Sequence, residues 1–237
     1  MKFTVCIPMY NESKIIAETA KTLSAYMSEN FEDYEIIFSD DGSKDGSSDI
    51  VKSLCLPNVQ VIGYPDNRGK GSAVREAMLA ATGDAVMFTD SDLAYGTDVI
   101  KRVADAFEES PECDLVVGSR SIAENGYDGY TFLRKIASKS YLTLLKMAGG
   151  LKISDSQCGC KAFSGRAAKK VFSHCEVNRF AFDFEAILIA EKCGYKIKEI
   201  PVKVINHGDS KVNVLRDSLK MIRDIMKMKK RISKLEI

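Results

Sequence analysis

The chain has 237 residues, of which 45% are hydrophobic and 28% are charged. This composition is typical of a globular protein and excludes a disordered or fibrous chain. The length allows one large domain or two small ones, and because the sequence has no internal repeat or linker we expect one. Lys and Arg number 34 against 33 Asp and Glu, so the net charge of +1 argues against a nucleic-acid-binding protein. The sequence has no apolar run near the roughly 20 residues that span a bilayer. The apolar segment at its N-terminus is too short and too strand-like to form a signal peptide.

Strand and helix patterns alternate through the first half of the chain. Short β-branched and apolar runs predict strands at 3–8, 34–39, 59–64, 85–89 and 115–118. Helical spacing predicts helices at 13–29, with Ser13 as N-cap, and at 49–54, 71–81 and 98–109. The alternation predicts an α/β fold with a single doubly wound, mostly parallel sheet flanked by helices.

The second half is less regular. We expect a helix at 130–148, a loop at 155–163 that leads into a strand, and a helix at 180–192. Residues 196–204 are expected to form a strand, and Pro201 places it at an edge of the sheet. Seven cysteines at scattered positions, without an export signal, predict free buried thiols rather than disulfides or a metal site.

Polar clusters follow the predicted strands at their carboxyl ends, where open α/β sheets bind ligands. They are Tyr10-Asn11-Glu12, Asp40-Asp41, Asp66 to Gly71, Asp90-Ser91-Asp92 and Ser119-Arg120. Asp90 and Asp92 suit Mg²⁺ or Mn²⁺ as oxygen ligands, although a helix-capping turn has the same pattern. Likewise, Asp40 and Asp41 fit either an Asx-turn or a carboxylate that binds a base or ribose. The sequence contains neither a Walker A motif nor G-x-G-x-x-G after the first strand.

The motifs occur in an order that resembles the family-two inverting glycosyltransferases, which have a GT-A fold. The matching segments are Ile7-Pro8-Met9-Tyr10-Asn11-Glu12, Asp40-Asp41-Gly42-Ser43, Asn67-Arg68-Gly69-Lys70-Gly71, Asp90-Ser91-Asp92 and Gly118-Ser119-Arg120. Residues 155–163, 179–185 and 200–202 are most similar to dolichyl-phosphate β-glucosyltransferases and related polyprenyl-phosphate glycosyltransferases. The resemblance covers about residues 3–211.

The resemblance implies a role for each matching residue. Donor nucleotide binding is implied for Pro8, Tyr10, Glu12, Asp41, Asp66, Lys70 and Asp90. Asp90 and Asp92 would hold Mg²⁺ or Mn²⁺ on the diphosphate, and Asp92 and Asp155 are the implied catalytic residues. Acceptor phosphate binding is implied for Arg120, Arg134 and Ser138. Two residues depart from the family pattern: Ala94 replaces a Gln of mannosyltransferase relatives, and Cys160 replaces the usual Phe.

The implied reaction moves a hexose from a nucleotide sugar, with UDP-glucose favoured and GDP-mannose left open, to a polyprenyl or dolichyl phosphate. A phosphate monoester is largely dianionic at pH 7, since its second pKa is about 6, and such a nucleophile hardly needs a general base. One alternative is transfer to a saccharide or lipid alcohol in cell-surface polysaccharide assembly, where Asp155 would take the proton. A catalytically silent nucleotide-binding module is a further alternative, which the retained carboxylates disfavour.

The C-terminal segment has a distinct charge pattern. Residues 211–234 contain nine Lys or Arg and two Asp, a net charge of +7, so the rest of the chain carries −6. Leu215, Leu219, Ile222 and Met226 recur at helical spacing, with Ile225 and Ile232 adjoining. We therefore expect a GT-A domain at 1–212 and a basic amphipathic helix at 213–237. This helix either docks on an anionic membrane, with the protein on the inner, cytoplasmic face, or packs on the domain. Assembly into a homo-oligomer is left open.

Overall fold

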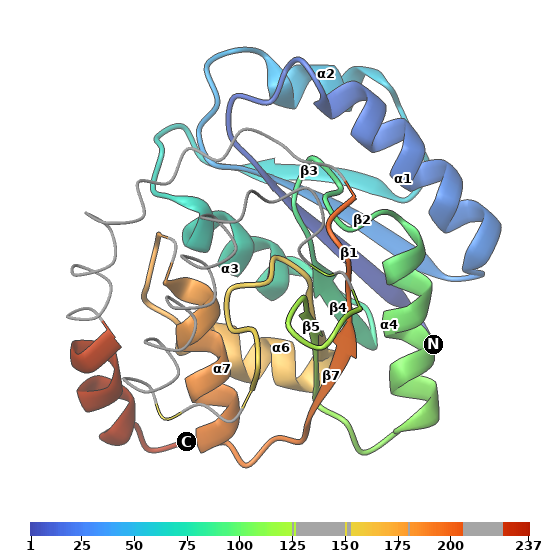
Figure 1. Ribbon diagram of the computed structural model, residues 1–237. Helices are drawn as coiled ribbons and strands as arrows, with labels where there is room; N and C mark the ends of the chain where they lie inside the picture. The colour runs from blue at the N-terminus through green and yellow to red at the C-terminus, as the bar shows by residue number, and fades with distance from the viewer. Residues whose placement is uncertain (125, 127–149, 151–152, 180, 206–224) are drawn as a thin grey trace.

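The computed structural model describes residues 1–124, 126, 150, 153–179, 181–205 and 225–237. A seven-stranded sheet lies at its centre, in the order β3-β2-β1-β4-β6-β5-β7 (Figure 1). The strands are β1 (Phe3–Met9), β2 (Tyr34–Asp40), β3 (Val59–Gly63), β4 (Ala85–Phe88), β5 (Leu115–Ser119), β6 (Lys161–Ser164) and β7 (Ile197–Pro201). Strand β6 is antiparallel to its neighbours β4 and β5, and every other pairing is parallel.

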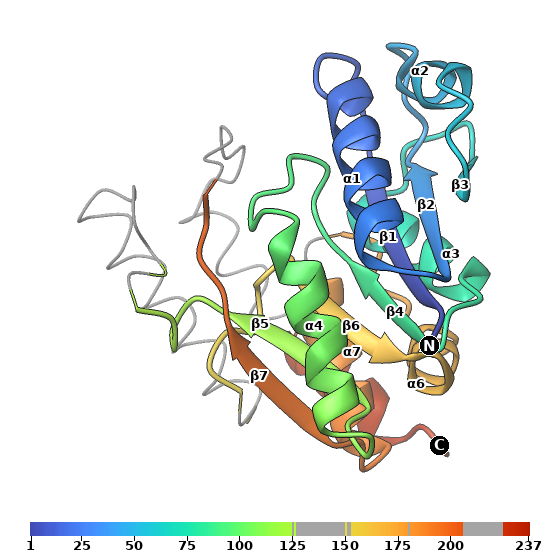
Figure 2. The same ribbon diagram turned by 90° about the vertical axis from the view of Figure 1, so that its right-hand side faces the viewer.

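Helices cover both faces of the sheet (Figure 2). One face packs against α1 (Ile16–Asn30), α2 (Ser47–Ser53) and α4 (Asp98–Glu109). The other packs against α3 (Lys70–Ala80), α6 (Gly165–Phe172) and α7 (Phe182–Lys192). Because alternate residues of a strand point to opposite faces, Val5 and Ile7 join the first apolar cluster and Cys6 joins the second. Burial on both faces explains why the strands read as continuous apolar runs.

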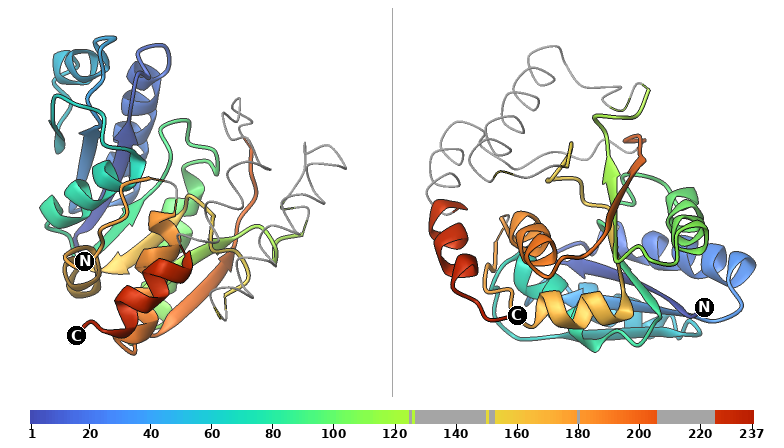
Figure 3. Two further views of the ribbon diagram at one scale, coloured as in Figure 1. Left: turned by 90° about the vertical axis from the view of Figure 1, so that its left-hand side faces the viewer. Right: turned by 90° about the horizontal axis from the view of Figure 1, so that it is seen from below.

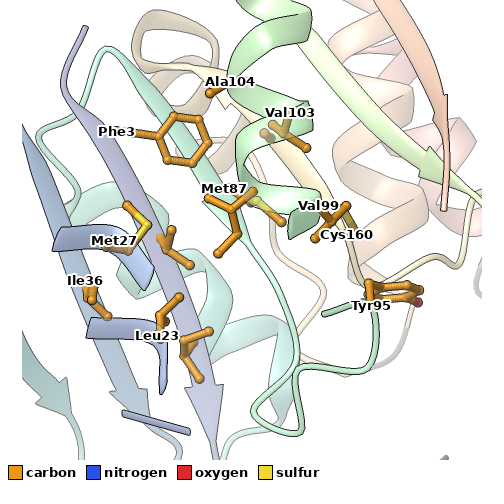
Figure 4. Close-up of a cluster of buried hydrophobic side chains, with 14 of the residues drawn as sticks. Phe3, Leu23, Met27, Ile36, Met87, Tyr95, Val99, Val103, Ala104 and Cys160 are labelled. Carbon is orange, nitrogen blue, oxygen red and sulfur yellow. The ribbon is translucent and has the colours of Figure 1, made fainter. Parts of the chain in front are cut away.

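The first cluster is held by side chains that recur at helical spacing on α1 and α4. Leu23 and Met27 of α1 and Val99 of α4 pack over Phe3 and Met87 of the sheet (Figure 4). All five side chains are at most 1% exposed. Burial of a side chain of this size contributes about 1.5–3 kcal/mol. These contacts fix the helices that lead into and out of the polar loops.

The predicted α/β fold is confirmed, and some local features differ from expectation. Ser13 does not cap α1: its backbone N–H donates to the Asp45 carboxylate at 2.9 Å, and the helix begins at Ile16. The short helix α6 was not expected. It follows β6 directly, without a loop that would mark its start in the sequence. The seven cysteines are free, as expected, but Cys55 is exposed rather than buried.

Two predicted helices fall wholly or partly outside the described residues: 130–148 lies outside, and the C-terminal helix is described only from residue 225. The chain is helical at 225–233, beside α7 (Figure 3). Ile225, Met228 and Ile232 are buried in the second apolar cluster, whereas Met226, which helical spacing placed in the apolar stripe, is 64% exposed. The described part of this helix thus packs its apolar side on the domain.

A buried ion pair strengthens this attachment. The Arg231 guanidinium pairs with Glu185 of α7, whose side chain is fully buried, and donates to the His174 carbonyl at 3.1 Å. Glu185 also accepts backbone hydrogen bonds from Glu176 and Val177. Breaking such a pair is costly because it leaves a charge buried without its partner. None of the helices within the described ranges has both the length and the apolar character needed to cross a bilayer.

Packing of the C-terminal helix on the domain makes a stability prediction. Ile232→Ala removes a buried side chain and should lower the free energy of unfolding by about 2–4 kcal/mol, measured by chemical denaturation. Met226→Ala is the matched control on the exposed side and should change it by less than about 0.5 kcal/mol. Equal effects of the two substitutions would contradict the packing.

Candidate functional site

The polar clusters meet at one edge of the sheet. Strands β1, β2, β4 and β5 end there, and β6 begins there because it runs antiparallel to β4 and β5. The segment before β6, which contains Asp155 and Gly159, therefore reaches the same edge as Asp90 and Arg120. The predicted convergence of these loops is found, and the reversed strand supplies a segment that a purely parallel sheet would place elsewhere.

The loops after β1 and β2 are tied to each other. The Asn11 N–H donates to Ser43 Oγ at 2.9 Å, and Asn11 Oδ1 accepts from the Lys44 N–H at 2.9 Å. Glu12 N–H donates to Ser47 Oγ at 2.8 Å. Asn11 has a φ of 53°, a left-handed conformation that Asn tolerates better than most residues. These contacts set the position of Tyr10, whose ring is 43% exposed.

Asp41 organises the loop that follows β3. Its carboxylate accepts hydrogen bonds from Tyr64 Oη at 2.7 Å and Asn67 Nδ2 at 2.7 Å, and from the N–H groups of Arg68 and Gly69 at 2.8 and 2.9 Å. The carboxylate of Asp40 makes a local turn contact, since it accepts from the Ser43 N–H at 2.9 Å. Binding of a base or ribose by Asp41 stays a prediction.

The other residues assigned to the nucleotide surround this loop. Pro8 is buried in β1, Asp66 is exposed in the loop after β3, and Lys70 begins α3. Arg68 stacks its guanidinium on the Tyr64 ring, 4.2 Å from the ring centre. The predicted donor residues thus lie at or beside the carboxyl ends of β1 to β4, and their contact with a nucleotide stays a prediction.

Asp90 lies at the centre of the edge. One oxygen of its carboxylate pairs with the Lys70 ammonium, and the other faces Gly159, where a Cβ would collide with it. Burial by itself would lower the pKa of Lys70, but the negative charges of Asp90 and Asp183 outweigh it and raise this pKa. Lys70 is therefore cationic where a diphosphate would carry its negative charge.

Asp92 lies in a turn, not in the extended backbone that we expected for residues 90–92. Its carboxylate accepts from the Ala94 N–H at 3.0 Å, and the Leu93 N–H donates to the Asp90 carbonyl at 3.0 Å. Burial and the nearby charge of Asp90 raise the pKa of Asp92. Two close carboxylates whose charges repel each other favour a cation between them, so Asp90 and Asp92 fit Mg²⁺ or Mn²⁺. Among the described residues they have no third carboxylate, His or Cys ligand, which leaves phosphate oxygens and water as the remaining ligands.

Asp155 and Arg120 form a buried bidentate pair. Arg120 Nε donates to one carboxylate oxygen at 2.7 Å, and Nη2 donates to the other at 2.9 Å. The Arg120 N–H adds a third bond at 3.1 Å. The Asp155 side chain has no exposed surface, and that of Arg120 is 14% exposed. Burial would raise the pKa of Asp155, but the hydrogen bonds and charge of Arg120 outweigh it and lower this pKa.

Neighbouring polar groups support this pair. Glu199 of β7 accepts from Ser154 Oγ at 2.5 Å and from the Ser154 N–H at 2.9 Å. The Ser154 and Ser119 hydroxyls lie 2.6 Å apart. Ser154 and Ser119 directly precede Asp155 and Arg120, so this network fixes the backbone of both. The other two predicted acceptor residues, Arg134 and Ser138, lie outside the described residues.

A second buried ion pair was missed by the sequence reasoning. Lys161 of β6 has no exposed side-chain surface, and its ammonium donates to Asp183 of α7 at 2.8 Å and to the Cys158 carbonyl. A lysine within the short apolar run 160–163 was the available signal, because a charge in a buried strand requires a partner. The motif comparison quoted both residues without assigning a role to either.

The model for "Glycosyl transferase family 2" matches residues 4–172. Dolichyl-phosphate beta-glucosyltransferase ALG5C of Trichomonas vaginalis is 34% identical over 236 residues, 95% of this chain and 70% of that protein. The dolichyl-phosphate beta-glucosyltransferase of Dictyostelium discoideum is 30% identical, over 95% of this chain and 73% of that protein.

A solved structure of glucosyl-3-phosphoglycerate synthase from Mycobacterium tuberculosis, in complex with Mn²⁺ and UDP-glucose, shares the fold. The TM-score is 0.70 at 18% identity, and the match covers all of this chain and 80% of that chain. The predicted GT-A fold is thereby confirmed. With a family model that matches most of the sequence, this chain belongs to glycosyl transferase family 2 and is a glycosyltransferase.

Proposed function

We propose that this glycosyltransferase moves a glucosyl residue from UDP-glucose to a polyprenyl phosphate such as dolichyl phosphate, with inversion at the anomeric carbon. The names of the curated relatives support both the sugar and the lipid phosphate. The structure with UDP-glucose and Mn²⁺ is related by fold alone, and it is compatible with the same donor here.

The observation that carries the proposal is the buried Arg120–Asp155 pair. A general base must accept a proton from the acceptor, yet both oxygens of Asp155 are occupied by Arg120 and its pKa is lowered. An alcohol acceptor needs such a base. A phosphate acceptor does not, because its oxygen already carries negative charge at neutral pH. Arg120 instead offers a guanidinium, which suits phosphate.

The reaction follows from these positions. A phosphate oxygen of the acceptor attacks the anomeric carbon, and the bond between that carbon and the diphosphate oxygen breaks on the opposite side. The bonding electrons leave with UDP, so negative charge develops on the diphosphate. Lys70 lies beside Asp90 to receive that charge. A divalent cation on Asp90 and Asp92 would supply further Lewis-acid stabilisation of the leaving group.

One prediction of the proposed function concerns the acceptor. With UDP-glucose and Mn²⁺ or Mg²⁺, the protein should release UDP at an appreciable rate only when a short polyprenyl phosphate is present. The measurement is UDP release with and without lipid, with the matching polyprenol as the control that lacks the phosphate. Turnover with the polyprenol instead would favour an alcohol acceptor and contradict the proposal. A parallel assay with GDP-mannose in place of UDP-glucose tests the identity of the sugar donor.

Another prediction of the proposed function concerns Asp155. We expect Asp155→Asn to raise the KM for the lipid phosphate by about tenfold, because Arg120 loses its charged partner, and to leave the dissociation constant of UDP within about twofold. The acid limb of the pH–rate profile should remain near pH 6, since it reports ionisation of the acceptor phosphate. Loss of that limb in the variant would identify Asp155 as the base and contradict the assignment.

We also propose that the protein works at an anionic membrane surface, where a lipid phosphate would be embedded. Lys227, Lys229, Lys230 and Lys234 are exposed on the C-terminal helix, while its apolar side is buried. Contact through these lysines is electrostatic, since Ile225, Met228 and Ile232 are buried against the domain. Each such lysine near an anionic surface contributes about 1 kcal/mol.

The triple variant Lys227→Glu, Lys229→Glu, Lys230→Glu should therefore bind vesicles with anionic lipid at least about tenfold more weakly than the wild type. Sedimentation with vesicles measures this, and neutral vesicles are the control. The melting temperature should change little because these side chains are exposed. Unchanged binding to anionic vesicles would contradict a role for this helix in docking.

A further inference from the structure

Four charged side chains of alternating sign lie at the carboxyl edge of the sheet. Lys161 pairs with Asp183, and Lys70 pairs with Asp90. Burial raises the pKa of Asp183 against the opposing charges of Lys161 and Lys70, and the charge of Asp183 is among those that raise the pKa of Lys70. Only Lys70 and Asp90 belong to the donor site described above. The other two are buried behind it and are not used by the proposed reaction.

The packing of two helix ends brings the start of α7, where Asp183 lies, to the start of α3, where Lys70 lies. Gly71, the neighbour of Lys70 in α3, has no room for a side chain, because a Cβ there would lie 2.7 Å from Cβ of Phe182. Phe182 is the neighbour of Asp183 at the start of α7. The amino ends of α3 and α7 are therefore in close contact, and this contact is fixed by a glycine.

Lys161 of β6 holds the Asp183 carboxylate. Its ammonium is fully buried, bridges Asp183 and the Cys158 carbonyl, and lies 5.7 Å from the centre of the Phe88 ring. Cys158 precedes Gly159, which touches the second oxygen of Asp90. One lysine thus connects α7 to the segment that backs Asp90.

We propose that Asp183, held by Lys161, is a positioning residue of the donor site that retains Lys70 when the carboxylate of Asp90 binds the donor complex. This inference rests on the proposed function, because it concerns the diphosphate of the same donor. Asp90 holds Lys70 with one oxygen and has little space beyond the other. Without Asp183, the Lys70 ammonium would compete with a divalent cation for Asp90. With Asp183, Lys70 keeps a negative partner and stays aimed at the diphosphate.

The test measures donor binding without an acceptor. Calorimetry of UDP with Mn²⁺ should give a dissociation constant about tenfold higher for Asp183→Asn than for the wild type. Because this single change leaves Lys161 buried without a charged partner, the double variant Lys161→Met/Asp183→Asn is measured as well. It removes both charges, should fold, and should show the same loss of UDP affinity. The KM for the lipid phosphate should stay within about twofold in both variants.

Asp114→Asn is the matched control. Asp114 is a buried carboxylate just before β5, paired with Arg166 at 2.7 Å, at the opposite edge of the sheet. The Asp114→Asn substitution should lower the melting temperature yet leave the UDP dissociation constant within about twofold of the wild-type value. An equal loss of UDP affinity in this control would show that Asp183→Asn acts through lower overall stability, and it would overturn the inference.

The decisive comparison uses Lys70→Met. If Asp183 acts through Lys70, adding Asp183→Asn to Lys70→Met should not weaken UDP binding further. Additive losses would overturn the inference and leave the proposed function standing. Failure of the wild-type protein to bind UDP at all would contradict the proposed function itself, and the inference would fall with it.

Discussion

The site depends on the direction of one strand. Strand β6 lies between β4 and β5 and runs antiparallel to both, so it begins at the edge of the sheet where β4 and β5 end. The segment that precedes β6 therefore meets Asp90 on one side, through Gly159, and Arg120 on the other, through Asp155. A parallel strand at this position would place the same segment at the far edge. The residues proposed to bind the donor and the acceptor come together because this strand is reversed.

Charges that the sheet buries must have partners, and the pairs found in the described residues form the framework of the site. Asp155, Lys161 and Glu185 each have a fully buried side chain, and each has an oppositely charged partner. Burial of a charge costs several kcal/mol unless its partner and hydrogen bonds compensate. A pair that is broken is therefore strongly unfavourable, which keeps Arg120, Asp183 and Arg231 in place. Two of the pairs border the site, and the third fixes the C-terminal helix.

The sequence predicts the fold well because its information is local and repeated. Continuous apolar runs mark the buried strands, and the polar loop after each strand marks the binding edge. The direction of β6 has no local pattern, since it is set by pairing between β4 and β5. The Ser13 cap failed for a similar reason: Ser13 bonds to Asp45, 32 residues away, and α1 begins only at Ile16, without a side-chain cap. Contacts between distant segments decided both cases.

The site residues divide along the same line. Asp41, Asp90 and Arg120 could be named from motifs, but their partners could not. Asp41 was expected to face a base, and its oxygens also hold the loop from Tyr64 to Gly69. Asp155 was expected near the reacting centre, and its carboxylate is covered by Arg120. A carboxylate whose charge is already matched is a poor proton acceptor and a good orienting group. The pairing, more than the residue type, thus separates a site built for an anionic nucleophile from one that must deprotonate an alcohol.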